Sequence, residues 1–140
     1  MSAAVDLLQE KFSDEVVEVV EFRGETTIVV QPGKIVEICR TLRDDHSTGF
    51  KYLSMIAGLD FLPQSPRFGL VYNLYSHKHH HRITLKTMLA HDAAPAIDSV
   101  TKVWCTANWP NTLGTLLVLV TLQIGYVIIL EATHGSCPER

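Results

Sequence analysis

Residues 67–89 read RFGLVYNLYSHKHHHRITLKTML, and two alternating patterns meet in this stretch. Apolar side chains recur with a spacing of two on each side of a histidine-rich centre. Because successive side chains of a strand point to opposite faces of a sheet, each half predicts a strand with one buried face. The segment HKHHH at 77–81 is then the tip of a hairpin. The alternating positions are Phe68, Leu70, Tyr72 and Leu74 in the first strand, and Ile83, Leu85 and Leu89 in the second.

The residues before this hairpin add a strand and an amphipathic helix. The run FKYLSMIAGLDFL at 50–62 is apolar enough for a buried strand that ends near Asp60, before the break at Pro63 and Pro66. Farther upstream, the segment 34–45 carries apolar side chains at positions i, i+3, i+4 and i+7, which form one stripe of a helix. The stripe consists of Ile35, Ile38, Cys39 and Leu42, so Cys39 is expected in the core.

Toward the N-terminus the sequence predicts a second hairpin and a short helix. The β-branched runs VVEVVEF at 16–22 and TTIVV at 26–30 are separated only by the turn residues 23–25, a spacing typical of a hairpin. Before them, Ser2 can cap a helix. The apolar positions Val5, Leu8 and Phe12 of that helix predict one buried face.

After the histidine-rich hairpin, Ala93–Pro95 and Asp98 predict a loop, and Ser99 can cap a helix that continues to Ala107. The elements together predict an α+β fold of two layers, in the order helix, β-hairpin, helix and three strands. The sheet is expected to be mixed, with the helices on one face. Residues 1–109 are assigned to this domain, and residues 110–140 to a divergent apolar C-terminal segment.

Composition and charge exclude several classes of protein. The 140 residues are 46% hydrophobic and 19% charged, within the globular range, and the net charge of -3 disfavours nucleic-acid binding. The three cysteines, Cys39, Cys105 and Cys137, show no CxxC spacing, which favours free thiols in a reducing compartment. The N-terminus has acidic residues within its apolar pattern, so it is not expected to be a signal peptide.

His77, His79, His80 and His81 are the candidate metal ligands of the chain, because imidazole binds zinc, nickel or copper. Three of them, His77, His79 and His81, have the period of two that projects side chains to one side of a strand. A structural metal site normally has four ligands, and no cysteine or acidic residue lies nearby in the sequence. A solvated hairpin tip is therefore the favoured interpretation of the segment 77–81.

Catalytic chemistry finds little support in the sequence. Neither Cys39 nor Cys105 is surrounded by a nucleophile motif, and the chain contains no P-loop, GxGxxG, HExxH or GxSxG pattern. Asp60 could be a buried acid at the end of its strand, although a carboxylate bonded to backbone amides in the following turn is the better interpretation. No catalytic, cofactor-binding or metal-binding residue is assigned.

Trp104, Asn108 and Trp109 carry the best local signal for an interface, since amphipathic aromatic side chains beside an amide are enriched at the centre of protein contacts. The alternative is that the two indoles close the end of the sheet. The sequence gives the two interpretations about equal weight.

Four segments, FRGETTIVV, RFGLVYNLYS, HRITLKTML and SVTKVWCTANW, follow one another in an order that resembles the N-terminal domain of the C subunit of NADH-quinone oxidoreductase. This family supplies a peripheral-arm subunit of respiratory complex I, and the resemblance covers roughly residues 5–109. It implies a scaffold subunit without its own cofactor or active site. NADH, FMN, iron-sulfur clusters and quinone would be bound elsewhere in the complex, with the D and B subunits as neighbours.

The same resemblance implies a peripheral position on the cytoplasmic face of the cell membrane, reached through the complex, and a supporting part in electron transfer and coupled proton translocation. Two alternatives stay open: a membrane-anchored binding protein whose C-terminal helix spans the bilayer, and a subunit of a related membrane-bound hydrogenase. The quinone used by the complex is not specified by these residues.

The resemblance stops at Trp109, where the family continues with an acidic and arginine-rich tail and this chain continues with PNTLGTLLVLVTLQIGYVIIL, which has no charged residue from Pro110 to Leu130. Its length permits a transmembrane helix, while its Val, Ile and Thr content favours buried strands. A change of reading frame near Asn111, or a truncation, is the third explanation and is ranked first.

Overall fold

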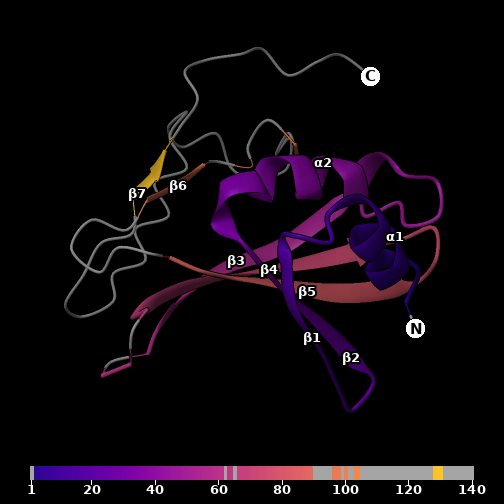
Figure 1. The fold of residues 1–140 in the computed structure, drawn as a ribbon. Helices are drawn as coiled ribbons and strands as arrows, with labels where there is room; N and C mark the ends of the chain where they lie inside the picture. The colour runs from indigo at the N-terminus through magenta and orange to yellow at the C-terminus, as the bar shows by residue number, and fades with distance from the viewer. Residues whose placement is uncertain are drawn as a thin grey trace.

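The structure is a computed structural model that describes residues 2–61, 63–64, 66–89, 96–98, 100, 103–104 and 128–130. Two helices and a five-stranded sheet form its two layers (Figure 1). The elements in chain order are α1 (Ala3–Lys11), β1 (Val16–Phe22), β2 (Glu25–Val30), η1 (Pro32–Lys34), α2 (Ile35–Asp44), β3 (Tyr52–Asp60), β4 (Phe68–Ser76), β5 (His81–Met88), β6 (Ala96–Asp98) and β7 (Ile128–Leu130).

The sheet has the strand order β1-β2-β5-β4-β3. Three of its four pairings are antiparallel, and the central pairing of β2 with β5 is parallel, from Thr26 opposite Ile83 to Val30 opposite Thr87. Both helices lie over the same face of this sheet (Figure 1). The predicted α+β fold, with a mixed sheet and helices on one face, is therefore confirmed.

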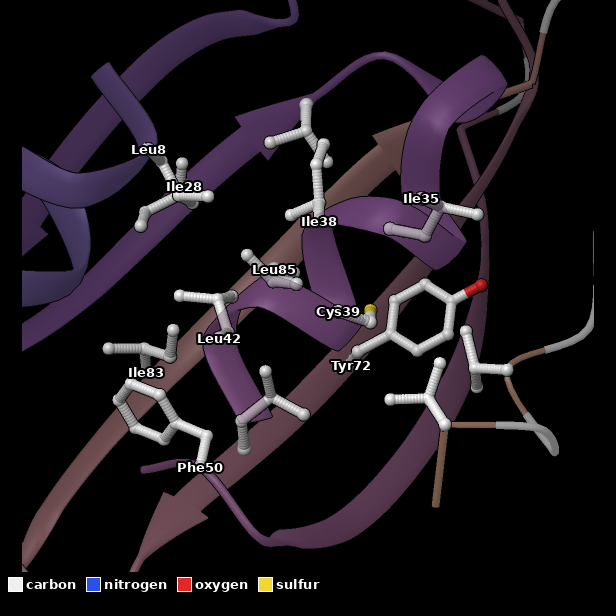
Figure 2. Close-up of a cluster of buried hydrophobic side chains, with 14 of the residues drawn as sticks. Leu8, Ile28, Ile35, Ile38, Cys39, Leu42, Phe50, Tyr72, Ile83 and Leu85 are labelled. Carbon is white, nitrogen blue, oxygen red and sulfur yellow. The ribbon is translucent and has the colours of Figure 1, made fainter. Parts of the chain in front are cut away.

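The core lies between the helices and the sheet. The whole apolar stripe of α2 is buried, as are the alternating positions of β4 and β5, because both patterns face the space between the two layers. Figure 2 shows these side chains meeting, with the sulfur of Cys39 beside the ring of Tyr72. α1 contributes Ala4, Val5, Leu7 and Leu8 to the same cluster.

Ser2 occupies the N-cap position of α1, as predicted, but its hydroxyl makes no capping hydrogen bond to the helix. It instead shares a 2.8 Å hydrogen bond with Nε2 of His81, the first residue of β5. The reason is tertiary: the packing of α1 on the sheet brings a ring nitrogen within reach of the hydroxyl, and that contact replaces the local one.

One prediction near residue 98 needs revision. Asp98 was expected in a loop, yet it ends β6, which pairs in parallel with β7 through Asp98 opposite Leu130. A pairing between segments so far apart in the chain leaves no local signal. Of the helix expected from Ser99, only Val100, Val103 and Trp104 lie within the described residues, and the backbone N–H of Trp104 donates to the Val100 carbonyl at 3.2 Å within a turn.

Most of the apolar C-terminal segment lies outside the described residues, apart from β7 (Ile128–Leu130). Among the residues that the structure does describe, no helix is long and apolar enough to cross a membrane. The division of the chain at residue 109 and the origin of the segment after it stay predictions.

Candidate partner interface

One row of residues across the sheet illustrates the helix-covered face. The register places five apolar side chains side by side, one from each strand. The three central ones are fully buried and the two outer ones pack against the core. This covered row consists of Val19, Ile28, Leu85, Tyr72 and Ile56, in the strand order of the sheet.

The neighbouring row, one residue away along most strands, lies on the opposite face, over which no described helix packs (Figure 1). Its centre is polar, and the Thr84 hydroxyl donates to Oδ1 of Asn73 at 2.9 Å. Its two ends are apolar and exposed, Val20 at 41% and Met55 at 46%. This open row consists of Val20, Thr27, Thr84, Asn73 and Met55.

The β1–β2 hairpin projects from the sheet beyond the helices (Figure 1). Val20 and Phe22 lie on its helix-free side, because alternate residues of a strand share a face, and Phe22 is 66% exposed. Reasoning from the sequence assigned this hairpin but no role to its side chains. The available signal was VVEVVEF itself, in which apolar residues fall on both faces of the strand instead of one.

Trp104 is 6% exposed, and its indole Nε1–H donates to the Phe50 carbonyl at 2.9 Å. The Arg43 guanidinium holds the adjacent turn by donating to the Val103 carbonyl. This geometry favours the alternative in which the Trp104 ring closes the core, since little of the ring is left for a partner. Asn108 and Trp109 lie outside the described residues, so their part in an interface stays a prediction.

Lys78 and His79 of the β4–β5 turn contact the loop that follows α2. Lys78 Nζ donates to the His46 carbonyl at 3.2 Å, and His79 Nε2 lies 3.2 Å from the same oxygen. Within the described parts of the chain, no three His, Cys, Asp or Glu side chains are arranged to hold a metal ion. The turn geometry thus gives His79 a structural contact, and the solvated-tip interpretation of the cluster stays a prediction.

Cys39 and Tyr72 are the buried ionisable groups at the centre of the core. Burial raises the pKa of the Cys39 thiol well above its ordinary value. Burial also raises the pKa of the Tyr72 phenol, with a smaller contribution from the nearby Cys39. Both groups therefore keep their protons at physiological pH, which makes neither of them a prepared nucleophile or base.

Two ion pairs neutralise charged groups around the end of α2. Lys11 of α1 lies 3.4 Å from a carboxylate oxygen of Asp45, and within α2 Arg43 donates to Asp44 at 2.6 Å. Hydrogen bonds from the Ser47 hydroxyl and amide lower the pKa of Asp45. Asp60 ends β3 opposite Phe68, and its side chain lies outside the described part of the structure. Most of the large exposed apolar side chains, Val20, Phe22, Tyr52 and Met55, lie on the helix-free side.

Residues 28–111 of the chain match a family model described as the respiratory-chain NADH dehydrogenase 30 kDa subunit. The chain therefore belongs to that family. The match confirms the resemblance seen in the sequence, and it spans β2 to β5, the part of the sheet that carries most of the core.

Individual relatives agree with the family. The chain is 43% identical over 107 residues to the C subunit of NADH-quinone oxidoreductase from Geobacter sulfurreducens, covering 76% of this chain and 64% of that protein. It is 39% identical over 106 residues to the protein of the same name from Geotalea uraniireducens, covering 76% and 63%. The chain thus spans less than two thirds of the length of these curated relatives.

A solved structure shares the fold. A chain in the structure of the membrane-bound sulfane sulfur reductase, an archaeal respiratory membrane complex, superposes with a TM-score of 0.60. The two chains are 21% identical, and the superposition covers 74% of this chain and 58% of the other. At this identity the similarity establishes the architecture alone.

Proposed function

We propose that the chain is a non-catalytic scaffold subunit in the peripheral arm of an NADH-quinone oxidoreductase. The observation that carries the proposal is the family match over residues 28–111, together with relatives named as the C subunit of that enzyme. As part of such an assembly the chain would support electron transfer from NADH to quinone and the coupled translocation of protons. The D and B subunits are the proposed neighbours.

A scaffold role agrees with the physical character of the described residues. Electron transfer between cofactors requires that neighbouring subunits are held at fixed distances, and a packed sheet supplies such rigidity without titrating groups. The buried Cys39 and Tyr72 retain their protons, so the covered row carries no charge. NADH, FMN, iron-sulfur clusters and quinone are accordingly proposed to be held by other subunits.

The test is purification of the native assembly through an affinity tag on this chain, from cells in which the tagged gene replaces the untagged one. We expect the tag to recover the D and B subunits together with NADH-dependent quinone reduction, and deletion of the gene to abolish both. Untagged cells are the control for nonspecific recovery. A tagged chain that is abundant but copurifies with no redox subunit would refute the proposal.

The proposed location is peripheral, on the cytoplasmic face of the cell membrane. Alkaline carbonate treatment of isolated membranes tests it, because a peripheral subunit is released and a spanning segment is retained. Release of the chain into the supernatant is the expected result. Retention in the pellet would favour the membrane-anchored binding protein instead.

Asn108 and Trp109 are proposed as part of the contact with neighbouring subunits, in keeping with the enrichment of tryptophan at interface centres. Trp109→Ala should reduce recovery of the assembly on the tag while the isolated chain keeps its melting temperature. An unchanged recovery would remove Trp109 from the interface and leave the assignment of the subunit intact.

A further inference from the structure

The uncharged stretch from Pro110 to Leu130 is tied to the domain on both sides. Before it, Trp104 donates its indole N–H at 2.9 Å to the carbonyl of Phe50, which lies just before β3. At its end, the three residues of β7 pair in parallel with β6 (Figure 1). Residues 105–127 join these two attachments, and we call them the C-terminal run.

Attachment on both sides argues against a membrane-spanning role for the run. A single transmembrane helix places its two ends on opposite sides of a hydrocarbon core that is ~30 Å thick. Here the residues before and after the run pair with the same domain. A return crossing would need about 40 apolar residues, which is more than the uncharged stretch contains. A path along the domain is therefore favoured.

The two attachments lie toward opposite ends of the sheet. Phe50 lies beside the start of β3 at Tyr52. β6 instead contacts η1, the short turn that follows β2 after Val30. The register places Val30 in the same row across the sheet as Gly58, near the other end of β3. The run thus starts where β3 starts and returns to the domain toward the end at which β3 finishes.

β3 is an edge of the sheet, and within the described residues it pairs with β4 alone. All its residues from Tyr52 to Leu59 are uncharged, and two of its apolar side chains are about half exposed, Tyr52 at 48% and Met55 at 46%. The shift in its register, between Leu53 and Met55, lies near its beginning. A long uncharged edge with open N–H and C=O groups is a template for a further strand.

The other edge strand has features that prevent such pairing. β1 carries Glu18 and Glu21, and its register shifts between Val16 and Glu18. Charges and bulges protect an edge strand from pairing with another segment. β1 is also separated from β3 by the three remaining strands of the sheet. Of the two edges, β3 is therefore the one suited to accept the run.

The composition of the run matches this edge. Residues 113–122 read LGTLLVLVTL, without a charged residue or a proline. Val and Thr are enriched in strands. An apolar segment that leaves water needs a partner for its backbone N–H and C=O groups, because unpaired groups are costly to bury. The outer side of β3 offers such partners along an equally uncharged strand.

We propose that the C-terminal run docks on the outer edge of β3 as an additional strand, parallel to β3, and that it does not anchor the protein in a membrane. The parallel direction follows from the order of the two attachments. Docking protects the edge from pairing with strands of other molecules, which is the usual route to edge-to-edge aggregation. The proposal does not depend on the proposed function, since it concerns how this chain completes its own sheet.

Amide hydrogen exchange of the intact chain, followed by NMR, tests the docking. The amides of β3 that do not bond to β4 should exchange as slowly as those of the central strand β5, while the outward amides of β1 should exchange fast. Equally fast exchange at the outer amides of β3 and β1 would overturn the proposal.

A proline variant tests whether the run is the cause of the protection. Val118→Pro with Val120→Pro removes two backbone N–H groups from the run and should speed exchange at the outer amides of β3 by about tenfold or more, without a change at β1. Ala132→Pro with Ser136→Pro, beyond β7, is the matched control and should leave β3 protected. An equal effect of the two pairs, or no effect of the first, would refute docking by the run.

Disulfide trapping tests the location of the run without proline. Ser54, exposed on β3, is replaced by cysteine in a chain with Cys105→Ser and Cys137→Ser, and a second cysteine is placed at each position from 115 to 121 in turn. We expect trapping that is strongest at the first of these positions, because Ser54 is near the start of β3. Val17→Cys on β1, 59% exposed in the native chain, is the control and should not be trapped. Equal trapping from Val17→Cys, or none from Ser54→Cys, would contradict the assigned edge.

Flotation with vesicles of phosphatidylethanolamine and phosphatidylglycerol tests the second half of the proposal. The intact chain should stay at the bottom of the gradient after an alkaline wash, since the run is occupied by β3. Flotation of the chain with the vesicles would overturn the proposal, while the assignment of the subunit would be decided separately by the recovery of the assembly.

Discussion

The two faces of the five-stranded sheet are made by the same strands, and a shift of one residue along most strands separates the covered row from the open row. The covered row is apolar from edge to edge, while the open row is polar at its centre and apolar only at its ends. The covered face therefore stabilises the fold through burial. The open face is polar at its centre and leaves Val20 and Met55 exposed at its ends. The residues that stabilise the fold are therefore different from those that are available for contact with another subunit.

The largest predicted effect is on the covered row. Leu85→Ala removes a fully buried side chain under the helices and should lower the free energy of unfolding by about 2–5 kcal/mol. Urea denaturation followed by circular dichroism measures the change. A loss below about 1 kcal/mol would mean that burial on the covered face does not stabilise the fold as described.

Substitution of Trp104 tests how much the turn that carries this residue stabilises the core. Trp104→Phe keeps an aromatic ring but deletes the indole N–H, which leaves the Phe50 carbonyl without its 2.9 Å hydrogen bond. A buried acceptor left unpaired costs about 1–3 kcal/mol of unfolding free energy. Wild-type stability in thermal and urea unfolding would instead mean that the ring merely rests on the surface.

The pH dependence of the unfolding free energy tests whether the Cys39 thiol is buried in the core beneath the helices. The folded-state pKa of its thiol is raised by burial, so only the unfolded chain loses this proton near the ordinary value of about 8.5. The thiol's contribution to the free energy of unfolding is complete below that pH. It is lost as pH rises above that value, by up to about 1.4 kcal/mol per pH unit.

The measurement is the unfolding free energy of wild type and Cys39→Ala between about pH 8.5 and 10, a range chosen below the ordinary pKa of tyrosine. The wild-type protein should lose stability more steeply with pH than the variant. Parallel slopes would show that the thiol ionises equally in the two states. Cys105 and Cys137 are present in both proteins and do not affect the difference.

On the open row the effect of a substitution should be smaller. Thr84→Ala deletes the hydroxyl that donates to Asn73, and its only partly buried position lets water replace the bond. We expect a loss of about 0.5–1 kcal/mol in urea unfolding. A loss as large as that of Leu85→Ala would erase the distinction between the two faces.

Met55→Ala should have the smallest effect, within about 0.5 kcal/mol, because Met55 is half exposed at the edge of the sheet. Differential scanning calorimetry of the isolated chain is the measurement. A large drop in melting temperature would show that this end of the open row is part of the core.

Much of the fold could be predicted because its signals are local. The stripe of α2 and the alternation in β4 and β5 each identify an element and its buried side, and all the residues predicted from these two patterns are buried. The tip at 77–81 was predicted from its polar composition, and the turn indeed spans His77–His80, with His81 opening β5.

The strand order and the exposed sites could not be predicted in the same way. The insertion of β5 between β2 and β4, the bond from Ser2 to His81 and the pairing of β6 with β7 join distant parts of the chain. Periodicity identifies the side of a strand that is buried but not its neighbours. For the same reason only the register shows that Glu25 lies beside Phe22 on the helix-free side.

The parallel pairing of β2 with β5 has a consequence for biosynthesis. The N-terminal hairpin leaves the ribosome first, but its attachment to the sheet must wait until β5, far along the chain, has been translated. Such long-range pairing is slow, and it leaves the apolar strands of the hairpin unprotected in the nascent chain. The two glutamates of β1, Glu18 and Glu21, would keep this waiting intermediate soluble until its place in the sheet exists.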